Sequence, residues 1–271
     1  MKAQSASEFP PTESAPRPPS SAMLIGEALS VFEAATSWLY AYRYPFPRVP
    51  RVHGKSILLI PGFMAGDLSL MPMASLCAYL GHRSEFGGIL SNSRCPRETL
   101  ELLSAKLDRM HGRAGEPIAV IGQSLGGVYA RLLAIRHPEL VERVITLGTP
   151  INSPAESAHP AISAIAARVG KLNGNPEGCL TESCPCGLAL SDLTTCDVPV
   201  TVVYSRRDGI VHWQSCVDRS GGANVDHQEV ISTHVAMGIS ADVCQIVADR
   251  LALPRREKKL PEHPPAETPA P

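Results

Sequence analysis

The sequence predicts an α/β fold in which a mostly parallel β-sheet is covered by helices on both faces. Short apolar segments alternate with segments of helical spacing along most of the 271 residues. The apolar segments are continuous rather than alternating, which is typical of strands buried on both faces of a parallel sheet. Hydrophobic residues make up 44% of the chain and charged residues 19%, so there is enough apolar surface for one sizeable core.

Five segments are expected to be strands, because they are short, rich in apolar and β-branched residues and bounded by turn residues. The first of them, for example, ends at Pro61 and Gly62. In chain order, the expected strands cover residues 56–60, 118–122, 141–148, 198–205 and 228–232.

Helices are expected between these strands, where apolar residues recur every three or four positions. Asp67 is expected to cap the first helix, because an aspartate side chain accepts hydrogen bonds from the N–H groups at a helix start. In chain order, the expected helices cover residues 67–80, 97–112, 126–137 and 241–252.

One segment, residues 150–196, interrupts the alternation and contains a helical piece around residues 161–170. An insertion after the strand that ends at Gly148 would lie over the carboxyl edge of the sheet, where open α/β folds bind ligands. Since long loops in compact domains tend to be functional, we expect this insertion to be a small cap. The alternative is that residues 150–196 form a surface loop without a binding role.

Both ends of the chain are expected to be disordered. Residues 1–21 and 254–271 are rich in proline and polar residues, and they cannot bury enough apolar surface to fold. One folded α/β domain is therefore expected over residues 22–253, with the cap insertion at residues 150–196 inside it.

The first helix of this domain is expected within residues 23–42. Glu27 and Glu33 interrupt its apolar residues, which follow helical spacing, so an amphipathic helix fits better than a membrane span. We expect the helix to pack on the domain, and peripheral contact with a membrane surface is the alternative.

Composition also limits the partners and the compartment. The formal net charge of −1 gives no reason to expect nucleic acid as a partner. The first residues lack the apolar core of a secretory signal, so a cytoplasmic protein with reduced thiols is expected. Four cysteines are clustered without paired C-x-x-C spacing, so no metal site is expected; they are Cys179, Cys184, Cys186 and Cys196.

The most informative motif is GQSLGG, which places Ser124 between Gly122 and Gly126. It follows an expected strand and opens an expected helix, which is the setting of a nucleophile elbow. In such a turn the serine backbone is strained, and side chains two positions away on either side would clash with backbone. The turn raises the hydroxyl above the sheet, and the helix N-terminus favours developing negative charge. We therefore expect Ser124 to be a nucleophile.

A serine nucleophile needs a base, and the base needs an orienting carboxylate. His234 is the expected base, because it directly follows the last expected strand at the edge where Ser124 emerges. His227 lies before that strand, at its opposite end, and His212 lies too close in sequence to the expected acid.

Asp208 is the expected acid, because it comes a short turn after the strand at residues 198–205 and can hold the imidazole tautomer. Asp226 lies at the wrong end of the last strand, and Asp192 lies inside the insertion. The alternative for Asp208 is a plain turn residue before Gly209, since Asp-Gly is a common turn pair.

Two backbone N–H groups are expected to form an oxyanion hole. One belongs to Leu125, directly after the nucleophile, and the other belongs to the loop PGFMAGD after the first strand. Within that loop Phe63 is the favoured donor and Met64 is the next candidate.

These motifs resemble the α/β-hydrolase family, in particular its lipase and esterase branch. The matching segments are LLIPGFMAGD, VIGQSLGGVYARLLA, VITLGTP, YSRRDGIV and STHVAMG, in the family's order. Directly before the nucleophile, lipases usually carry histidine or another residue, and this chain has Gln123. The mechanism does not require a particular side chain there.

The resemblance implies hydrolysis of a carboxylic ester, either a small molecule or a lipid, through an acyl-enzyme and without a cofactor or metal. Acyl transfer by the same three residues and a non-catalytic binding role of the same fold are the alternatives. The sequence does not determine the oligomeric state or the acyl chain length.

Overall fold

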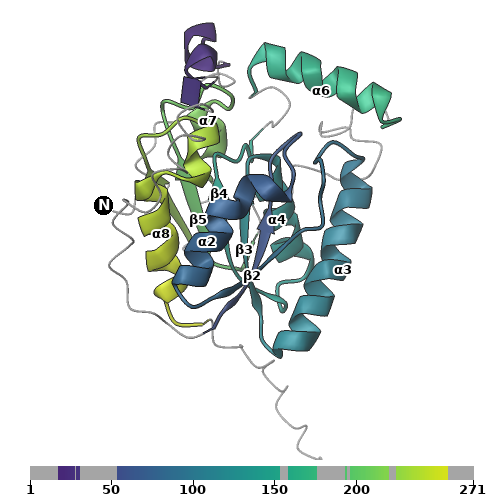
Figure 1. Ribbon diagram of the computed structural model, residues 1–271, viewed down its shortest axis with the longest axis vertical. Coiled ribbons are helices and arrows are strands. Elements are labelled where there is room, and N and C mark those ends of the chain that lie inside the picture. Colours follow the sequence, from purple (N-terminus) through teal and green to yellow (C-terminus); the bar gives the residue numbers. More distant parts are fainter. Residues whose placement is uncertain are drawn as a thin grey trace, which may run out of the picture.

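The computed structural model describes residues 18–27, 29–30, 54–152, 158–175, 193, 196–219 and 224–255. In this part of the chain six parallel strands form one sheet in the order β2-β1-β3-β4-β5-β6 (Figure 1). The strands are β1 (Ser56–Ile60), β2 (Arg83–Phe86), β3 (Ile118–Gln123), β4 (Val141–Leu147), β5 (Val200–Tyr204) and β6 (Val225–Glu229). The predicted fold class is therefore confirmed.

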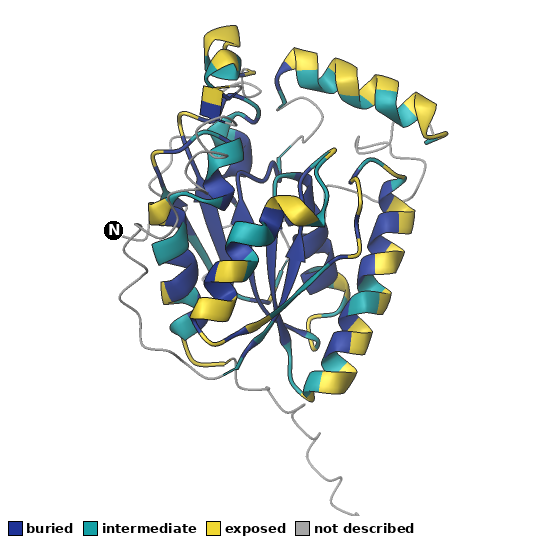
Figure 2. Cartoon of the chain, in the orientation of Figure 1, coloured by how far each residue is buried: buried dark blue, intermediate teal, exposed yellow. Residues whose placement is uncertain are grey.

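Helices cover both faces of the sheet. They are α3 (Pro96–Ala114) and α4 (Leu125–Arg136) on one face and α2 (Met71–Tyr79) and α8 (Ala241–Ala252) on the other. The short helix α7 (Trp213–Cys216) follows β5, and α6 (Pro160–Leu172) lies beyond the end of the sheet (Figure 1). On β1, Leu58 and Ile60 belong to a core with α3 and α4, whereas Ile57 and Leu59 belong to a core with α2 and α8. Figure 2 shows the buried sheet between these layers. Burial on both faces explains why the central strands are mostly apolar.

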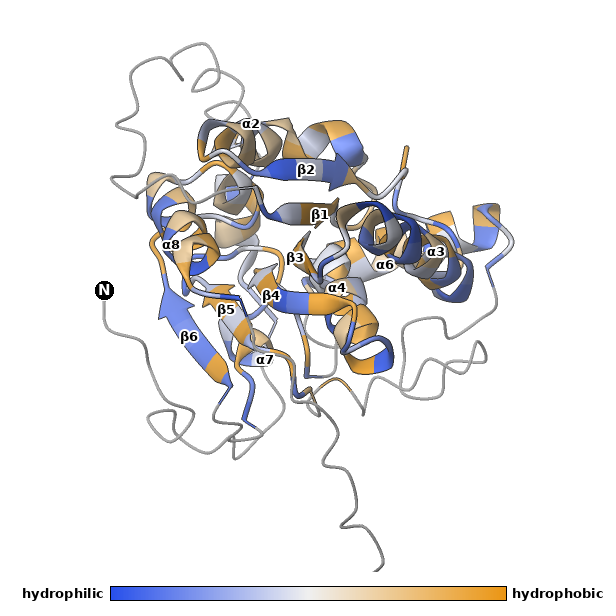
Figure 3. Ribbon diagram, turned by 90° about the horizontal axis from the view of Figure 1, so that it is seen from below, coloured by the Kyte–Doolittle hydropathy of each residue, from blue (hydrophilic) through white to orange (hydrophobic). Residues whose placement is uncertain are grey.

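The two edge strands differ from the sequence-based prediction. The sequence does not predict β2, because its segment RSEF is largely polar. In the described sheet, β2 is an edge strand that pairs with β1. β6 lies at Val225–Glu229 rather than at 228–232, and it pairs only with β5. Figure 3 shows both edge strands as largely hydrophilic. An edge strand has a neighbour on one side only, so polar residues suit it and no apolar segment marks it.

Asp67 does not cap a helix, contrary to the expectation. It is the first residue of a 3₁₀ turn, Asp67–Leu70, whose N-cap is Gly66, and α2 begins only at Met71. The Asp67 carboxylate instead accepts hydrogen bonds from the backbone N–H groups of Gly88 and Ile89, at 2.9 Å each. It therefore ties the loop after β1 to the loop after β2, a contact between segments that a local pattern does not reveal.

Two further segments lie at the carboxyl edge of the sheet. Residues 21–27 and 29–30 are helical and contact the loops after β5 and β6, and α6 lies at the same end of the molecule (Figure 1). Among the described residues, no helix is long and apolar enough to cross a membrane.

Some predictions fall on the rest of the chain. The remainder of the expected first helix, residues 31–42, and the expected disordered segments, apart from residues 18–21 and 254–255, lie outside the described residues. Of the clustered cysteines only Cys196 is described, and its thiol is free.

Candidate active site

Ser124 occupies the junction between β3 and α4. Its backbone has φ 51° and ψ −123°, a conformation that non-glycine residues rarely adopt. The strain persists because β3 and α4 are both buried and fix the chain on either side. The serine is the N-cap of α4, so its hydroxyl lies at the positive end of that helix.

The glycines around Ser124 are required by close backbone approach. A Cβ atom on Gly122 would lie 2.3 Å from the carbonyl oxygen of Gly126. A Cβ atom on Gly126 would lie 2.2 Å from the carbonyl oxygen of Ile60, on the neighbouring strand β1. Any side chain at either position would therefore force β3, α4 and β1 apart.

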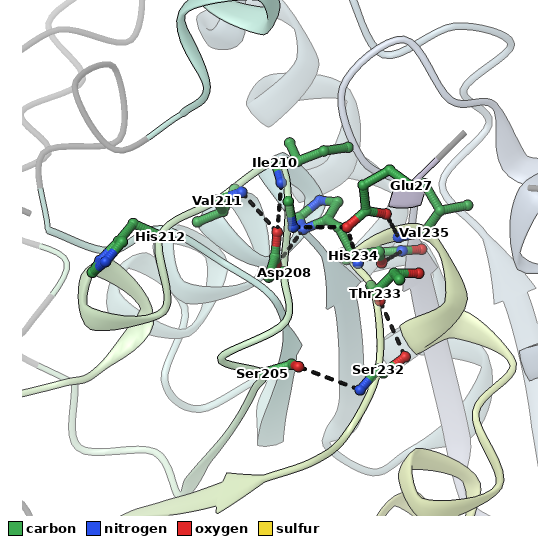
Figure 4. A network of polar contacts seen from close by, with 12 residues as sticks. Glu27, Ser205, Asp208, Ile210, Val211, His212, Ser232, Thr233, His234 and Val235 are labelled. Atoms are coloured by element: carbon green, nitrogen blue, oxygen red, sulfur yellow. Dashed lines mark hydrogen bonds and ion pairs between the residues drawn. The ribbon is translucent and has the colours of Figure 1, made fainter. Parts of the chain in front are cut away.

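Asp208 and His234 form a buried hydrogen-bonded pair (Figure 4). The two atoms His234 Nδ1 and Asp208 Oδ2 are 2.6 Å apart, and a carboxylate only accepts, so the imidazole N–H donates. The other oxygen of Asp208 accepts from the backbone N–H groups of Ile210 at 2.9 Å and Val211 at 2.7 Å. These bonds orient the carboxylate toward the imidazole and leave Nε2 as the free side of the ring.

The surroundings of His234 raise its pKa above the ordinary value of 6.5. Burial by itself lowers this pKa, because it disfavours the charged imidazolium. The charge of Asp208 and its hydrogen bond act in the opposite direction and outweigh burial, and the charge of Glu27 adds to them. The pair is therefore suited to stabilising an imidazolium that forms during a reaction.

Gln123 connects the strand that carries the serine to the loop that carries the histidine. Its Nε2 donates to the backbone carbonyl of His234 at 3.0 Å, and its side chain packs against Gly238. The residue directly before Ser124 thus fixes the backbone of the expected base, a role that was not predicted for this position.

The loop after β1 approaches the elbow closely. A Cβ atom on Gly62 would lie 3.2 Å from the Cβ of Ser124. The backbone N–H of Met64, which has φ 58°, donates to the carbonyl of Asn92 at 3.0 Å, so this amide is engaged away from the serine. The buried side chain of Asn92 also donates to the carbonyl of Pro61 at 2.7 Å, which fixes the start of the loop. Phe63 therefore stays the favoured candidate of this loop, as predicted, and Met64 the second.

Leu125, the other expected donor, is the first residue of α4. The first N–H groups of a helix have no partner within that helix, so α4 itself supplies no acceptor to this amide. Leu125 is itself buried, and its side chain belongs to the core with α3.

The rejected histidines have other roles. His227 lies within β6 rather than before it, is fully buried, and its Nε2 accepts from the backbone N–H of Asp218 at 3.0 Å. His212 is the N-cap of α7 and accepts from the backbone N–H of Gln214.

The rejected acids lie elsewhere as well. Asp226 is bound by Arg250 at 2.6 Å and by the hydroxyl of Thr201 at 2.7 Å, at the amino end of β6. Asp192 lies outside the described residues.

The helix α6 of the expected cap is attached at both ends to loops of this edge. The backbone N–H of His159 donates to the carbonyl of Ile210, two residues after the acid, at 2.8 Å. At the other end, the side-chain NH₂ groups of Asn173 and Asn175 donate to the backbone carbonyl of Ser93 at 2.9 and 3.0 Å.

Four apolar residues at helical spacing form a stripe along α6, and this apolar stripe is only partly covered; its residues are Ile162, Ile165, Ala166 and Val169. No residue of α6 is fully buried, and Ile165 is 44% exposed. Ile162, Ala166 and Val169 are half-buried. An apolar face that is held over the sheet edge without joining the core is what a substrate-facing cap requires.

Three side chains that shape this site, Asn92, Gln123 and Glu27, were not expected from the sequence. Each acts by bonding to backbone groups of a distant loop. Such contacts depend on which loops lie close together in the folded chain, so no sequence motif or residue spacing predicts them.

Comparisons with known proteins agree with this architecture. The family model described as "alpha/beta hydrolase fold" matches residues 114–185, which include the elbow. The lipase BlEst2 from Bacillus licheniformis is similar in structure, with a TM-score of 0.54, 17% identity, and coverage of 78% of this chain and 94% of that one. A structure of the metagenome-derived lipolytic enzymes LipS and LipT gives a TM-score of 0.55 and 17% identity, covering 76% and 93% of the two chains.

The carboxylesterase CesB from Bacillus subtilis gives a TM-score of 0.50 and 16% identity, covering 73% of this chain and 82% of that one. No match is found among curated protein sequences. At these identities the structural likeness concerns the fold. The parallel sheet, the strand–serine–helix turn and the family-model match together identify this chain as a protein of the α/β-hydrolase fold.

Proposed function

We propose that this protein hydrolyses carboxylic esters by a serine mechanism with Ser124 as nucleophile, His234 as base and Asp208 as orienting acid. The observation that carries the proposal is the buried Asp208–His234 hydrogen bond of 2.6 Å at the sheet edge where the strained Ser124 turn emerges. The names of the similar structures, a lipase, lipolytic enzymes and a carboxylesterase, support the same class of substrate.

In the proposed reaction the Ser124 oxygen attacks the ester carbonyl while Nε2 of His234 takes the hydroxyl proton. The carbonyl oxygen becomes an oxyanion, which the N–H groups of Leu125 and Phe63 stabilise by hydrogen bonds. Collapse of this intermediate releases the alcohol, which takes the proton from His234, and leaves an acyl-enzyme. Water then attacks the acyl group by the same route and releases the carboxylic acid.

The substrates that we propose are small-molecule or lipid esters, and the proposed location is the cytoplasm. Peripheral contact with a membrane is part of the same proposal if the substrate is a lipid. None of the steps requires a metal or an organic cofactor.

A direct test combines substrate hydrolysis with active-site labelling. The purified protein is assayed against p-nitrophenyl esters of short to long acyl chains, and it is treated with a fluorophosphonate probe followed by peptide mapping. Hydrolysis together with labelling at Ser124 supports the proposal. Absence of hydrolysis across the series, or a label on another residue, contradicts it.

The pH profile gives an independent prediction about His234. Only the neutral imidazole can take a proton, so kcat/KM should rise with pH and reach half its plateau above pH 6.5, because the pKa of His234 is raised. The measurement is kcat/KM for one ester across the acidic and neutral range. A midpoint below 6.5 would contradict the assigned pairing of His234 with Asp208.

The cap gives a prediction about chain length. The double substitution Ile165→Ser and Val169→Ser should reduce turnover of octanoate esters selectively, because each buried CH₂ contributes about 0.8 kcal/mol. Loss of contact with two methylenes already corresponds to roughly a tenfold fall in kcat/KM for octanoate. Acetate esters, which do not reach the apolar stripe, should be little affected.

The matched control changes the opposite side of the same helix. Ala164→Ser and Ala167→Ser lie at exposed positions of α6 and should leave the octanoate-to-acetate ratio unchanged. An equal loss on both esters in the Ile165/Val169 variant would mean that the stripe serves packing and that α6 is not an acyl-binding cap.

A further inference from the structure

A buried carboxylate from the N-terminal helix lies between the two loops that carry the acid and the base. Glu27 Oε1 accepts hydrogen bonds from the backbone N–H groups of Gly209 at 2.8 Å and His234 at 2.6 Å. Its Oε2 accepts from the N–H of Val235 at 3.0 Å. Figure 4 shows the Glu27 side chain beside His234 and Val235. One side chain therefore joins the residue after Asp208 to the backbone of His234.

The burial of Glu27 is unusual for this residue type. Its exposure is only 3%, and a buried carboxylate is costly unless hydrogen bonds replace its water shell. Here three N–H donors converge on the two oxygens, which suits a group that can only accept. A partner set made entirely of backbone groups from two distant loops indicates that the side chain holds those loops rather than an ion.

Further contacts hold the N-terminal helix against the same loops. A Cβ atom on Gly209 would lie 2.4 Å from the carbonyl oxygen of Met23, so the helix backbone rests directly on the residue after the acid. The hydroxyl of Thr233 donates to Ser30 at 2.7 Å.

The buried side of this helix is polar, because Glu27 and Ser30 are buried while Ile25 and Leu29 are 64% and 65% exposed. The helix is thus attached to the domain through hydrogen bonds to the two loops. Among the described residues, the helix therefore packs on the domain as the sequence predicts, and the contacts that hold it there are polar.

We propose that Glu27 is a positioning residue, which fixes the Asp208 loop and the His234 loop at the separation that their mutual hydrogen bond requires. The two loops follow different strands, β5 and β6. Besides the Asp208–His234 pair, the described residues of these loops are joined by a long bond of 3.3 Å from the N–H of Ser232 to the hydroxyl of Ser205. The hydrogen bonds of Glu27 go to backbone N–H groups and not to the imidazole ring or to the carboxylate of Asp208, so its positioning effect passes through the backbone. The kinetic consequence of this role rests on the proposed ester hydrolysis.

The expected effect is on kcat rather than on KM. Displacement of a reacting group by about 1 Å can cost about 10²-fold in rate, so Glu27→Ala should lower kcat by roughly that factor. KM should change little, because the hydrogen bonds of Glu27 go to the backbone of the two loops rather than to the expected nucleophile or oxyanion donors. Glu27→Gln keeps one acceptor oxygen but places an NH₂ group against an N–H donor, so it should lose less than Glu27→Ala. The matched control is Glu101→Gln, at an exposed position of α3, which should leave kcat unchanged.

A pH profile separates positioning from general loss of stability. Among the described residues, the charged groups that face His234 are Asp208 after β5 and Glu27 from the N-terminal helix. The charge of Glu27 raises the pKa of His234, so Glu27→Gln should move the acidic limb of kcat/KM to lower pH. A residue that only adds stability would lower the melting temperature and leave that limb in place.

Amide hydrogen exchange tests the role without any assay of activity. In the wild-type protein the N–H groups of Gly209, His234 and Val235 should be protected, and in Glu27→Gln these three should exchange faster than amides of the central strands. If the wild-type protein hydrolyses no ester, the proposed function fails, while the exchange measurement still decides the role of Glu27. Unprotected amides in the wild-type protein, or full kcat with an unshifted limb in Glu27→Gln, would overturn the inference.

Discussion

Replacing Ser124 with alanine (Ser124→Ala) is expected to lower kcat for ester hydrolysis by several orders of magnitude. The substitution removes the attacking oxygen, so no acyl-enzyme can form, and only the oxyanion donors and substrate binding remain. In serine hydrolases this residual machinery gives about 10³-fold acceleration over water. The fold should persist, because alanine is smaller than serine and the backbone at this position is already accommodated between β3 and α4.

The measurement is kcat for a p-nitrophenyl ester together with fluorophosphonate labelling, both of which should be lost in Ser124→Ala. The matched control is Ser75→Ala on α2, an exposed serine that donates to the carbonyl of Met71. Its activity and labelling should equal those of the wild-type protein. Retention of ordinary turnover by Ser124→Ala would exclude the elbow as the site of covalent chemistry.

The second large effect is expected for Asp208→Asn, with a loss of kcat on the order of 10⁴-fold. The carboxamide can present its NH₂ group to Nδ1 of His234, which favours the tautomer with the proton on Nε2 and removes the base that Ser124 needs. The two N–H groups of Ile210 and Val211 can still bond to the remaining oxygen, so the loop should keep its conformation.

The control for Asp208→Asn is Asp226→Asn, which changes a carboxylate bound by Arg250 and Thr201 at the amino end of β6. This variant should lose stability rather than turnover. If Asp226→Asn instead showed the large loss of kcat, or if Asp208→Asn were fully active, the acid would be misassigned.

Ser124, His234 and Asp208 should also behave as one unit. The double variant Ser124→Ala/His234→Ala should be about as slow as Ser124→Ala alone, because the base has no purpose without the nucleophile. Multiplicative losses would indicate that the two residues act in separate steps.

The sequence by itself determined the central sheet and the elbow. The segments of β1, β3, β4 and β5 are mostly apolar because both of their faces are buried, and this leaves a signal within each segment, although β4 begins with the sequence Val-Glu-Arg. The elbow motif also leaves a local signal, because Gly122, Ser124 and Gly126 lie close together in the chain. Chain order led to the prediction of Asp208 and His234 as acid and base; their roles stay a prediction, and the structure brings His234 Nδ1 to 2.6 Å from Asp208 Oδ2.

The tertiary structure alone decided the edges of the sheet and the support of the site. β2 and β6 are stabilised by pairing with one neighbour, so their own residues carry no strong pattern. Glu27 stands 182 positions before Gly209 in the chain, and in the sequence it reads only as an interruption of an apolar helix. Its role exists because folding brings three backbone N–H groups from two loops to one carboxylate, and hydrogen bonds between distant segments leave no periodicity in a sequence.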